Sequence, residues 1–126
     1  YFTFTLEEGE AIDSITLISS TNLAGGSDST CFIGLAFDNI FDFDPDAQTG
    51  PGLVGFALSN SFNIGRDILP DLSAGLSTLA PGDYTIWTQQ TNPDITRLHL
   101  EFNVVPTPMT AAPLALLGLS AVRRRR

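Results

Sequence analysis

Apolar and polar residues alternate along most of the first 105 residues, and this period of two constrains the fold more than any other feature. In the stretch 95–105 apolar side chains fall on one side and polar ones on the other: Leu98, Leu100, Phe102 and Val104 against Arg97, His99, Glu101 and Asn103. Because successive side chains of a strand point to opposite faces, this stretch is expected to be a half-buried strand.

Five further stretches are expected to be strands: 1–6, 11–20, 30–37, 53–59 and 84–90. The stretch 30–37 is apolar on both sides, which indicates a central strand. Between 66 and 83 there is no clean helical face, and prolines and glycines interrupt the chain, so at most one short helical turn is expected near Asp67–Leu72. Short strands separated by turns predict an all-β fold, an antiparallel β-sandwich or jelly roll, followed by a short C-terminal apolar helix.

The charge of the chain is divided unevenly. All fourteen Asp and Glu precede Pro106 and are accompanied there only by Arg66 and Arg97, so residues 1–105 carry a formal charge of −12. The chain contains no lysine. Such an acidic body repels nucleic acid and anionic membrane surfaces, and we expect no nucleic-acid partner.

The C-terminal residues follow a different pattern. A proline motif, Val105–Pro108, leads into the uncharged apolar segment Met109–Val122 and then into Arg123–Arg126, where the chain ends. The apolar segment would be about 21 Å long as a helix, against about 30 Å of bilayer hydrocarbon, so it is a marginal span. The positive-inside rule would keep the arginines cytoplasmic. The sequence therefore predicts a domain over 1–105 and a sorting or anchor segment over 106–126. The alternative is an apolar end that packs on its own domain.

This tail resembles the PEP-CTERM sorting signal of exported bacterial proteins. The motif corresponds to Val105, Pro106, Thr107 and Pro108, with Thr107 where the family usually has Glu. The resemblance implies export, transient membrane anchoring, cutting near Pro106–Pro108 by a membrane transpeptidase of the exosortase type, and delivery to the cell surface or extracellular matrix. The apolar anchor would be formed by Leu114, Leu116, Leu117, Leu119 and Val122, and the basic cluster by Arg123, Arg124, Arg125 and Arg126.

Two stretches of the body resemble bacterial pre-peptidase C-terminal (PPC-type) β-sandwich domains. They are YFTFTLEEGEAIDSITL at 1–17 and LAPGDYTIWTQQ at 79–90, where Leu79, Gly82 and Tyr84 match the family's Leu-x-x-Gly-x-Tyr strand. The resemblance implies a secreted accessory module and names no active site. Because the chain begins inside an alternating strand, we expect it to be a fragment of a longer precursor.

The residues that commonly carry catalysis are sparse. Cys31, the single cysteine, is in step with the apolar residues Ile33 and Leu35 and is expected to be a small buried hydrophobe. The single histidine, His99, falls on the polar face of its strand. No nucleophile elbow, zinc motif or phosphate loop is present. We therefore expect a non-enzyme without catalytic residues or a required cofactor.

Two places remain as candidate ligand sites. Asp42, Asp44 and Asp46 stand at alternate positions, a spacing at which carboxylates can wrap Ca²⁺; the alternative is a solvated acidic loop of an acidic protein. Trp87 shares a strand face with Thr85 and Gln89, so its ring is a candidate for stacking on a sugar or for packing beneath a loop. The alternative function is thus a carbohydrate- or calcium-dependent adhesion module with a polysaccharide partner.

Overall fold

A computed structural model of the chain describes residues 1–23, 31–38, 53–90 and 96–107. The elements of these residues are β1 (Phe2–Leu6), β2 (Glu10–Asn22), β3 (Cys31–Phe37), β4 (Leu53–Leu58), α1 (Leu69–Leu72), β5 (Gly82–Gln90) and β6 (Thr96–Pro106). The prediction of an all-β fold is confirmed, and the short helical turn lies where the sequence places it. The expected C-terminal helix falls outside the described residues.

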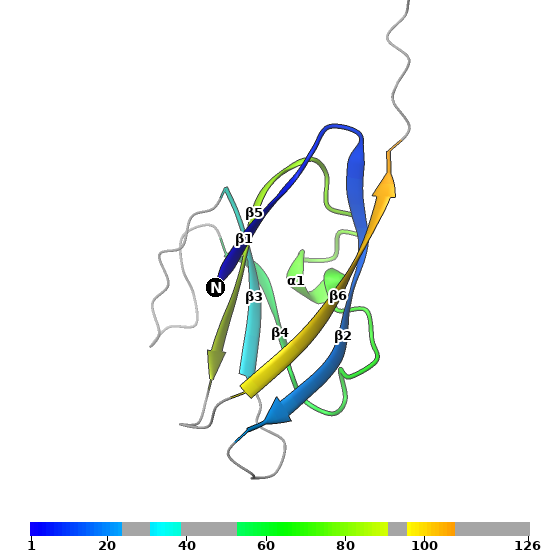
Figure 1. Cartoon of the computed structure of the whole chain (residues 1–126). Coiled ribbons are helices and arrows are strands. Elements are labelled where there is room, and N and C mark those ends of the chain that lie inside the picture. The colour runs from blue at the N-terminus through cyan, green and yellow to red at the C-terminus, as the bar shows by residue number, and fades with distance from the viewer. Residues whose placement is uncertain (24–30, 39–52, 91–95, 108–126) are drawn as a thin grey trace, which may run out of the picture.

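The strands form two antiparallel sheets that face each other (Figure 1). The larger sheet has the order β1-β5-β3-β4, and the smaller one pairs β2 with β6. β3 lies between β5 and β4, as its apolar residues on both sides predict. The result is a sandwich-like arrangement in which the smaller sheet covers only part of the larger one.

The core lies between the sheets and is aliphatic. Its buried members come from every described element except β6, whose Leu98, Leu100 and Phe102 pack against it while partly buried. The fully buried larger side chains are Ile12, Ile15, Leu17, Ile33, Leu35, Ile68, Leu69, Leu72, Leu79 and Ile86. On the strands these positions are two residues apart, because alternate side chains point inward, except that Ile12 and Ile15 of β2 are separated by a register shift.

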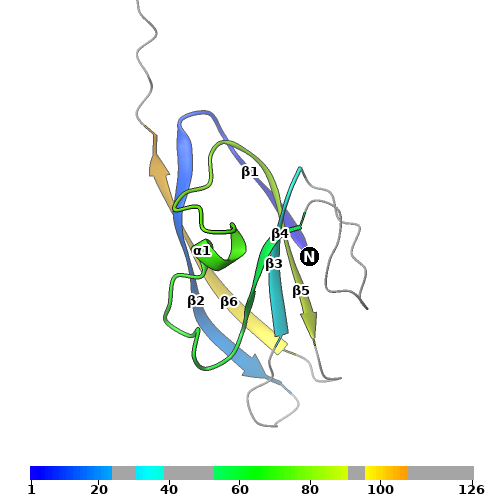
Figure 2. The same cartoon turned by 180° about the vertical axis from the view of Figure 1, so that it is seen from behind.

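One side of the sandwich is closed by the chain between β4 and β5. α1 contacts β4, β2 and β3 and lies between β2 and β4 (Figure 2). Its side chains Leu69 and Leu72 are completely buried, and so is Ile68 just before it. Pro70 sits at the start of the turn, where a missing N–H costs nothing, and the Ser73 hydroxyl donates to the Leu69 carbonyl oxygen at 2.7 Å.

The same connection also covers the edge of β2 that faces away from β6. The Leu17 N–H donates to the Arg66 carbonyl oxygen at 3.1 Å, and the Ile68 N–H donates to the Ile15 carbonyl oxygen at 2.8 Å. Farther along, Ile12 and Leu79 exchange two backbone hydrogen bonds. The connection between β4 and β5 therefore bonds to the edge of β2 as a third strand would, although its sequence has no strand periodicity. We call this side of the sandwich the closed side.

The ends of the long strands differ from the sequence expectation. β2 extends to Asn22 and contains register shifts between Ile12 and Ser14 and between Leu17 and Ser19. Such bulges add twist and let a long strand wrap the core. β6 continues past Val104, since Val105 pairs with Ala11 and Pro106 with Glu10. The fold thus includes the first residue of the segment 106–126.

Candidate functional site

The side of the sandwich opposite the closed side is open. Here the larger sheet ends at β1 and the smaller one at β6, and both are terminal strands of their sheets. The inward side chains of these strands are incompletely covered, so that Phe2 is 45% exposed and Val104 is 49% exposed. An edge strand with apolar side chains and no described neighbour is a surface that can accept a further group.

Two hollows lie along this open side. The first, of about 390 Å³, is lined by Phe2, Cys31, Thr88, Thr96, Leu98, His99, Leu100 and Phe102. The second, of about 260 Å³, is lined by Phe2, Phe4, Thr5, Leu6, Ile12, Phe102 and Val104. Because both include Phe2 and Phe102, they adjoin one another, and together we call them the lateral groove.

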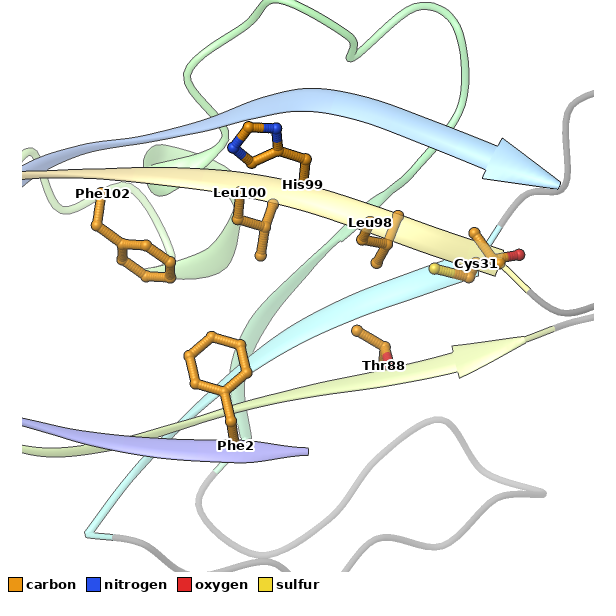
Figure 3. A pocket seen from close by; sticks show the side chains of 8 residues that line it. Phe2, Cys31, Thr88, Leu98, His99, Leu100 and Phe102 are labelled. Carbon is orange, nitrogen blue, oxygen red and sulfur yellow. The ribbon is translucent and has the colours of Figure 1, made fainter. Parts of the chain in front are cut away.

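Aromatic contacts join the two sheets across the middle of the lateral groove. The ring of Phe102 meets those of Phe2 and Phe4 edge to face, with centroid distances of 6.0 and 5.4 Å. Phe4 in turn stacks on Tyr84 at 5.4 Å. In Figure 3 Phe2 and Phe102 point toward one another from opposite sheets. These contacts hold the sheets together where no connecting chain covers them in the described residues.

The described lining of the groove is uncharged; it is mostly apolar in the second hollow and mixed in the first. No Asp, Glu, Lys or Arg lines either hollow among the described residues, and the polar groups there are threonine hydroxyls and the Cys31 thiol. His99 borders the first hollow, but its imidazole points away from it (Figure 3). The described lining of the groove therefore suits an uncharged group with apolar parts.

Cys31 lies at one end of the groove as a buried thiol, as the sequence predicts. Burial raises the pKa of this thiol above its ordinary value, and a hydrogen bond with Ser59 opposes the shift. The Ser59 hydroxyl also accepts the Cys31 N–H at 2.9 Å. A neutral buried thiol is a weak nucleophile, so Cys31 acts in packing.

Trp87 occupies a different place from the one its polar neighbours suggest. It is 3% exposed, and Thr85 on the same face is completely buried. Its indole lies over Gly34, where an added Cβ would fall 2.1 Å from Cε2 of the ring. A ring this buried presents no face to a sugar, so packing is the interpretation that the structure supports.

The predicted calcium ligands Asp42, Asp44 and Asp46 lie outside the described residues. Just before them, Asp38 and Asp83 border a hollow of about 270 Å³ at the start of β5. The Asp38 N–H donates to the Asp83 carbonyl oxygen at 2.9 Å, and the Thr5 hydroxyl donates to the Asp83 carboxylate at 2.6 Å. Across the described parts of the chain, no group of three or more His, Cys, Asp and Glu is placed to hold a metal ion.

Tyr84 lines the same hollow with its ring. Its hydroxyl donates to the Ala80 carbonyl oxygen at 2.6 Å. Burial, and then the negative charge of Asp38, raise the pKa of Tyr84 because both disfavour the phenolate. Tyr84 therefore remains a neutral hydrogen-bond donor that fixes the turn before β5.

Only the beginning of the predicted sorting segment is described. Val105 and Pro106 belong to β6, and the Thr107 N–H donates to the Gly9 carbonyl oxygen at 2.8 Å. Pro108, the apolar anchor residues and Arg123–Arg126 lie outside the described residues. No helix in the described ranges has the length and apolar character that crossing a membrane would require.

No family model, curated protein or solved structure matches this chain significantly. The lateral groove was not predicted from the sequence. The alternation assigns Phe2, Phe4 and Phe102 to inward faces. It does not indicate which strands lie at the edges of the sheets, and the groove depends on that.

Proposed function

We propose that this chain is an exported, non-catalytic β-sandwich protein that is held briefly in a membrane by its C-terminal segment and then delivered to the cell surface or extracellular matrix. The observation that carries the proposal is the step in composition after Pro108. An uncharged apolar segment of fourteen residues, Met109–Val122, is followed by four arginines at the end of a chain whose body carries −12. That order favours a body outside the cytoplasm and a basic end inside.

The described fold is consistent with a separate role for the body and for the C-terminal segment. Every member of the core cluster lies before β6 or within it, and β6 ends at Pro106. Within the described residues, the core is formed by side chains that precede the apolar segment. In the finer architecture that we propose, the strands form a jelly roll and the apolar segment becomes a short helix in the membrane.

The pairing of β6 also bears on where a processing enzyme would cut. A transpeptidase needs an extended, accessible segment, whereas Val105 and Pro106 are paired with β2 and the Thr107 N–H is bonded to Gly9. We therefore place the cut of an exosortase-type enzyme after Thr107, beyond the last paired residue. A cut before Pro106 would require the end of β6 to separate from β2.

The test is made in a bacterial host that carries such an enzyme. Replacing Arg123–Arg126 by Ser should reduce the membrane-held precursor and disturb processing, as seen by fractionation and by mass spectrometry of the mature C-terminus. The matched control is Arg97→Ser, which removes an exposed arginine from the body and should leave sorting unchanged. Protein released to the medium with its four C-terminal arginines intact would refute the proposal.

A further inference from the structure

The lateral groove is a continuous path along β6 that is uncharged in its described lining and partly apolar. Its first hollow includes Thr96, Leu98 and Leu100, and its second includes Val104, with Phe102 shared by both. The path thus follows the inward side of β6 from Thr96 to Val104. Exposed apolar surface in such a path is unfavourable in water, so an apolar occupant would be stabilised there.

The described chain ends beside one end of this path. Val104 lines the groove, and Thr107, three residues later, is still tied to Gly9 by its N–H. The described chain therefore ends at Thr107, beside the groove. Pro108 comes next in the sequence, and Met109–Val122, the uncharged apolar segment, follows it. This apolar segment is thus joined to the end of the groove by a connection of turn length.

The lengths of the groove and the segment agree. Eight residue steps separate Thr96 from Val104, which correspond to about 27 Å of strand at about 3.4 Å per residue. The fourteen residues Met109–Val122 span about 21 Å as a helix and up to about 48 Å when extended. In either conformation the segment is long enough to cover most or all of the groove.

Two arguments favour the chain's own segment over a second copy. A short tether gives the segment an effective concentration in the millimolar range, which a separate molecule rarely reaches. In addition, two bodies of −12 repel one another, which disfavours the close approach of a second copy.

We propose that, in aqueous solution, the chain's own apolar segment Met109–Val122 folds back and occupies the lateral groove between β1 and β6. The contact shields the segment and the groove from water at the same time. It does not depend on the sorting function proposed above, since it concerns the chain away from a membrane.

Paramagnetic relaxation in the full chain tests the proposal. A nitroxide is attached at Ala115→Cys in a Cys31→Ala background, and methyl signals are compared with the label oxidised and reduced. We expect Leu98, Leu100 and Val104 to lose most of their intensity. Ile64 and Leu76, which are exposed on the closed side, should lose much less. Equal effects at both sets, or none, would overturn the proposal.

Two further samples identify the occupant. In the first sample, chains that carry the spin label but no isotope are mixed with chains that carry the isotope but no spin label, so that only contacts between molecules reduce the signals. Loss of signal at Leu98 in this mixture would assign the groove to a second copy and overturn the proposal. Substituting both Leu116→Glu and Leu117→Glu should abolish the loss in the singly labelled chain, because charged side chains do not enter an apolar groove. Ile64→Glu, a charge added outside the groove, should leave it unchanged.

Discussion

The closed and open sides of the sandwich are built from similar alternating strands but differ in what covers them. On the closed side the connection between β4 and β5 fills the space, and Ile68, Leu69 and Leu72 are completely buried. On the open side β1 and β6 end their sheets, and Phe2 and Val104 are about half exposed. Burial of an inward-facing side chain therefore depends on the neighbouring layer as much as on the strand that carries it.

The two sides also differ in how backbone groups are satisfied. On the closed side β2 bonds residues 65–68 and 79, which supply hydrogen bonds without forming a named strand. On the open side the contacts across the sandwich are between aromatic rings. We infer that the closed side contributes more to stability, and the following substitutions test that inference by urea unfolding followed by circular dichroism.

Leu69→Ala should have the largest effect. It removes a completely buried side chain from α1, and we expect a loss of about 2–5 kcal/mol in the free energy of unfolding because a cavity remains between the sheets. A loss below about 1 kcal/mol would mean that α1 contributes little to the core and that the closed side is not the more stable one.

Phe102→Ala should cost less although it removes a larger side chain. Phe102 is only partly buried, so we expect about 1–3 kcal/mol rather than the 3–5 kcal/mol typical of a fully buried phenylalanine. The measurement compares the loss in the free energy of unfolding with that of Leu69→Ala under the same conditions. If Phe102→Ala is the more destabilising of the two, the open side contributes more than its exposure indicates.

Gly55→Ala tests the contact between β4 and α1. An added Cβ would lie 2.3 Å from the Asp71 carbonyl oxygen and 2.8 Å from that of Leu72. These are backbone atoms that cannot rotate away, so α1 must shift, and we expect a cost of about 1–3 kcal/mol. An unchanged midpoint of unfolding would contradict the described packing of α1 on β4.

Asp67→Ala tests the hydrogen bonds that close the edge of β2. The Asp67 carboxylate accepts the N–H groups of Ile15 and Leu69 at 2.9 and 3.0 Å. Without it both donors lose their acceptor, and we expect a cost of about 1–2 kcal/mol. Asp67→Asn keeps one acceptor oxygen and should cost less, and Asp71→Ala, an exposed control in α1, should change stability by no more than about 0.5 kcal/mol. Equal losses for Asp67→Ala and Asp71→Ala would rule out this role.

His99→Ala should have the smallest effect. His99 lies on β6 between two groove residues, yet it is exposed and points away from the core. We expect a change within about 0.5 kcal/mol. A larger loss would show that the outward face of β6 has a neighbour that the alternation and the described contacts do not reveal.

Much of the local structure could be predicted from the sequence. The period of two located most of the described strands and assigned Leu98, Leu100 and Phe102 to the inward face of β6, while apolar residues on both sides indicated β3. The alternation also placed Cys31 in the core, and the prolines and glycines after residue 66 limited the chain there to one helical turn near Asp67–Leu72. These features depend on nearest neighbours along the chain, since the alternation of side chains is a property of any extended backbone. The charge step after Pro108 is likewise contained in the sequence alone.

Only the tertiary structure decided which strands became edges and what covered each face. Trp87 has polar neighbours on its face but is buried over Gly34, because β3 and β5 pair at that point. The lateral groove exists because β1 and β6, ninety residues apart, each end a sheet on the same side. Such outcomes depend on pairing between distant segments, and the local pattern of one strand is compatible with a central position or an edge.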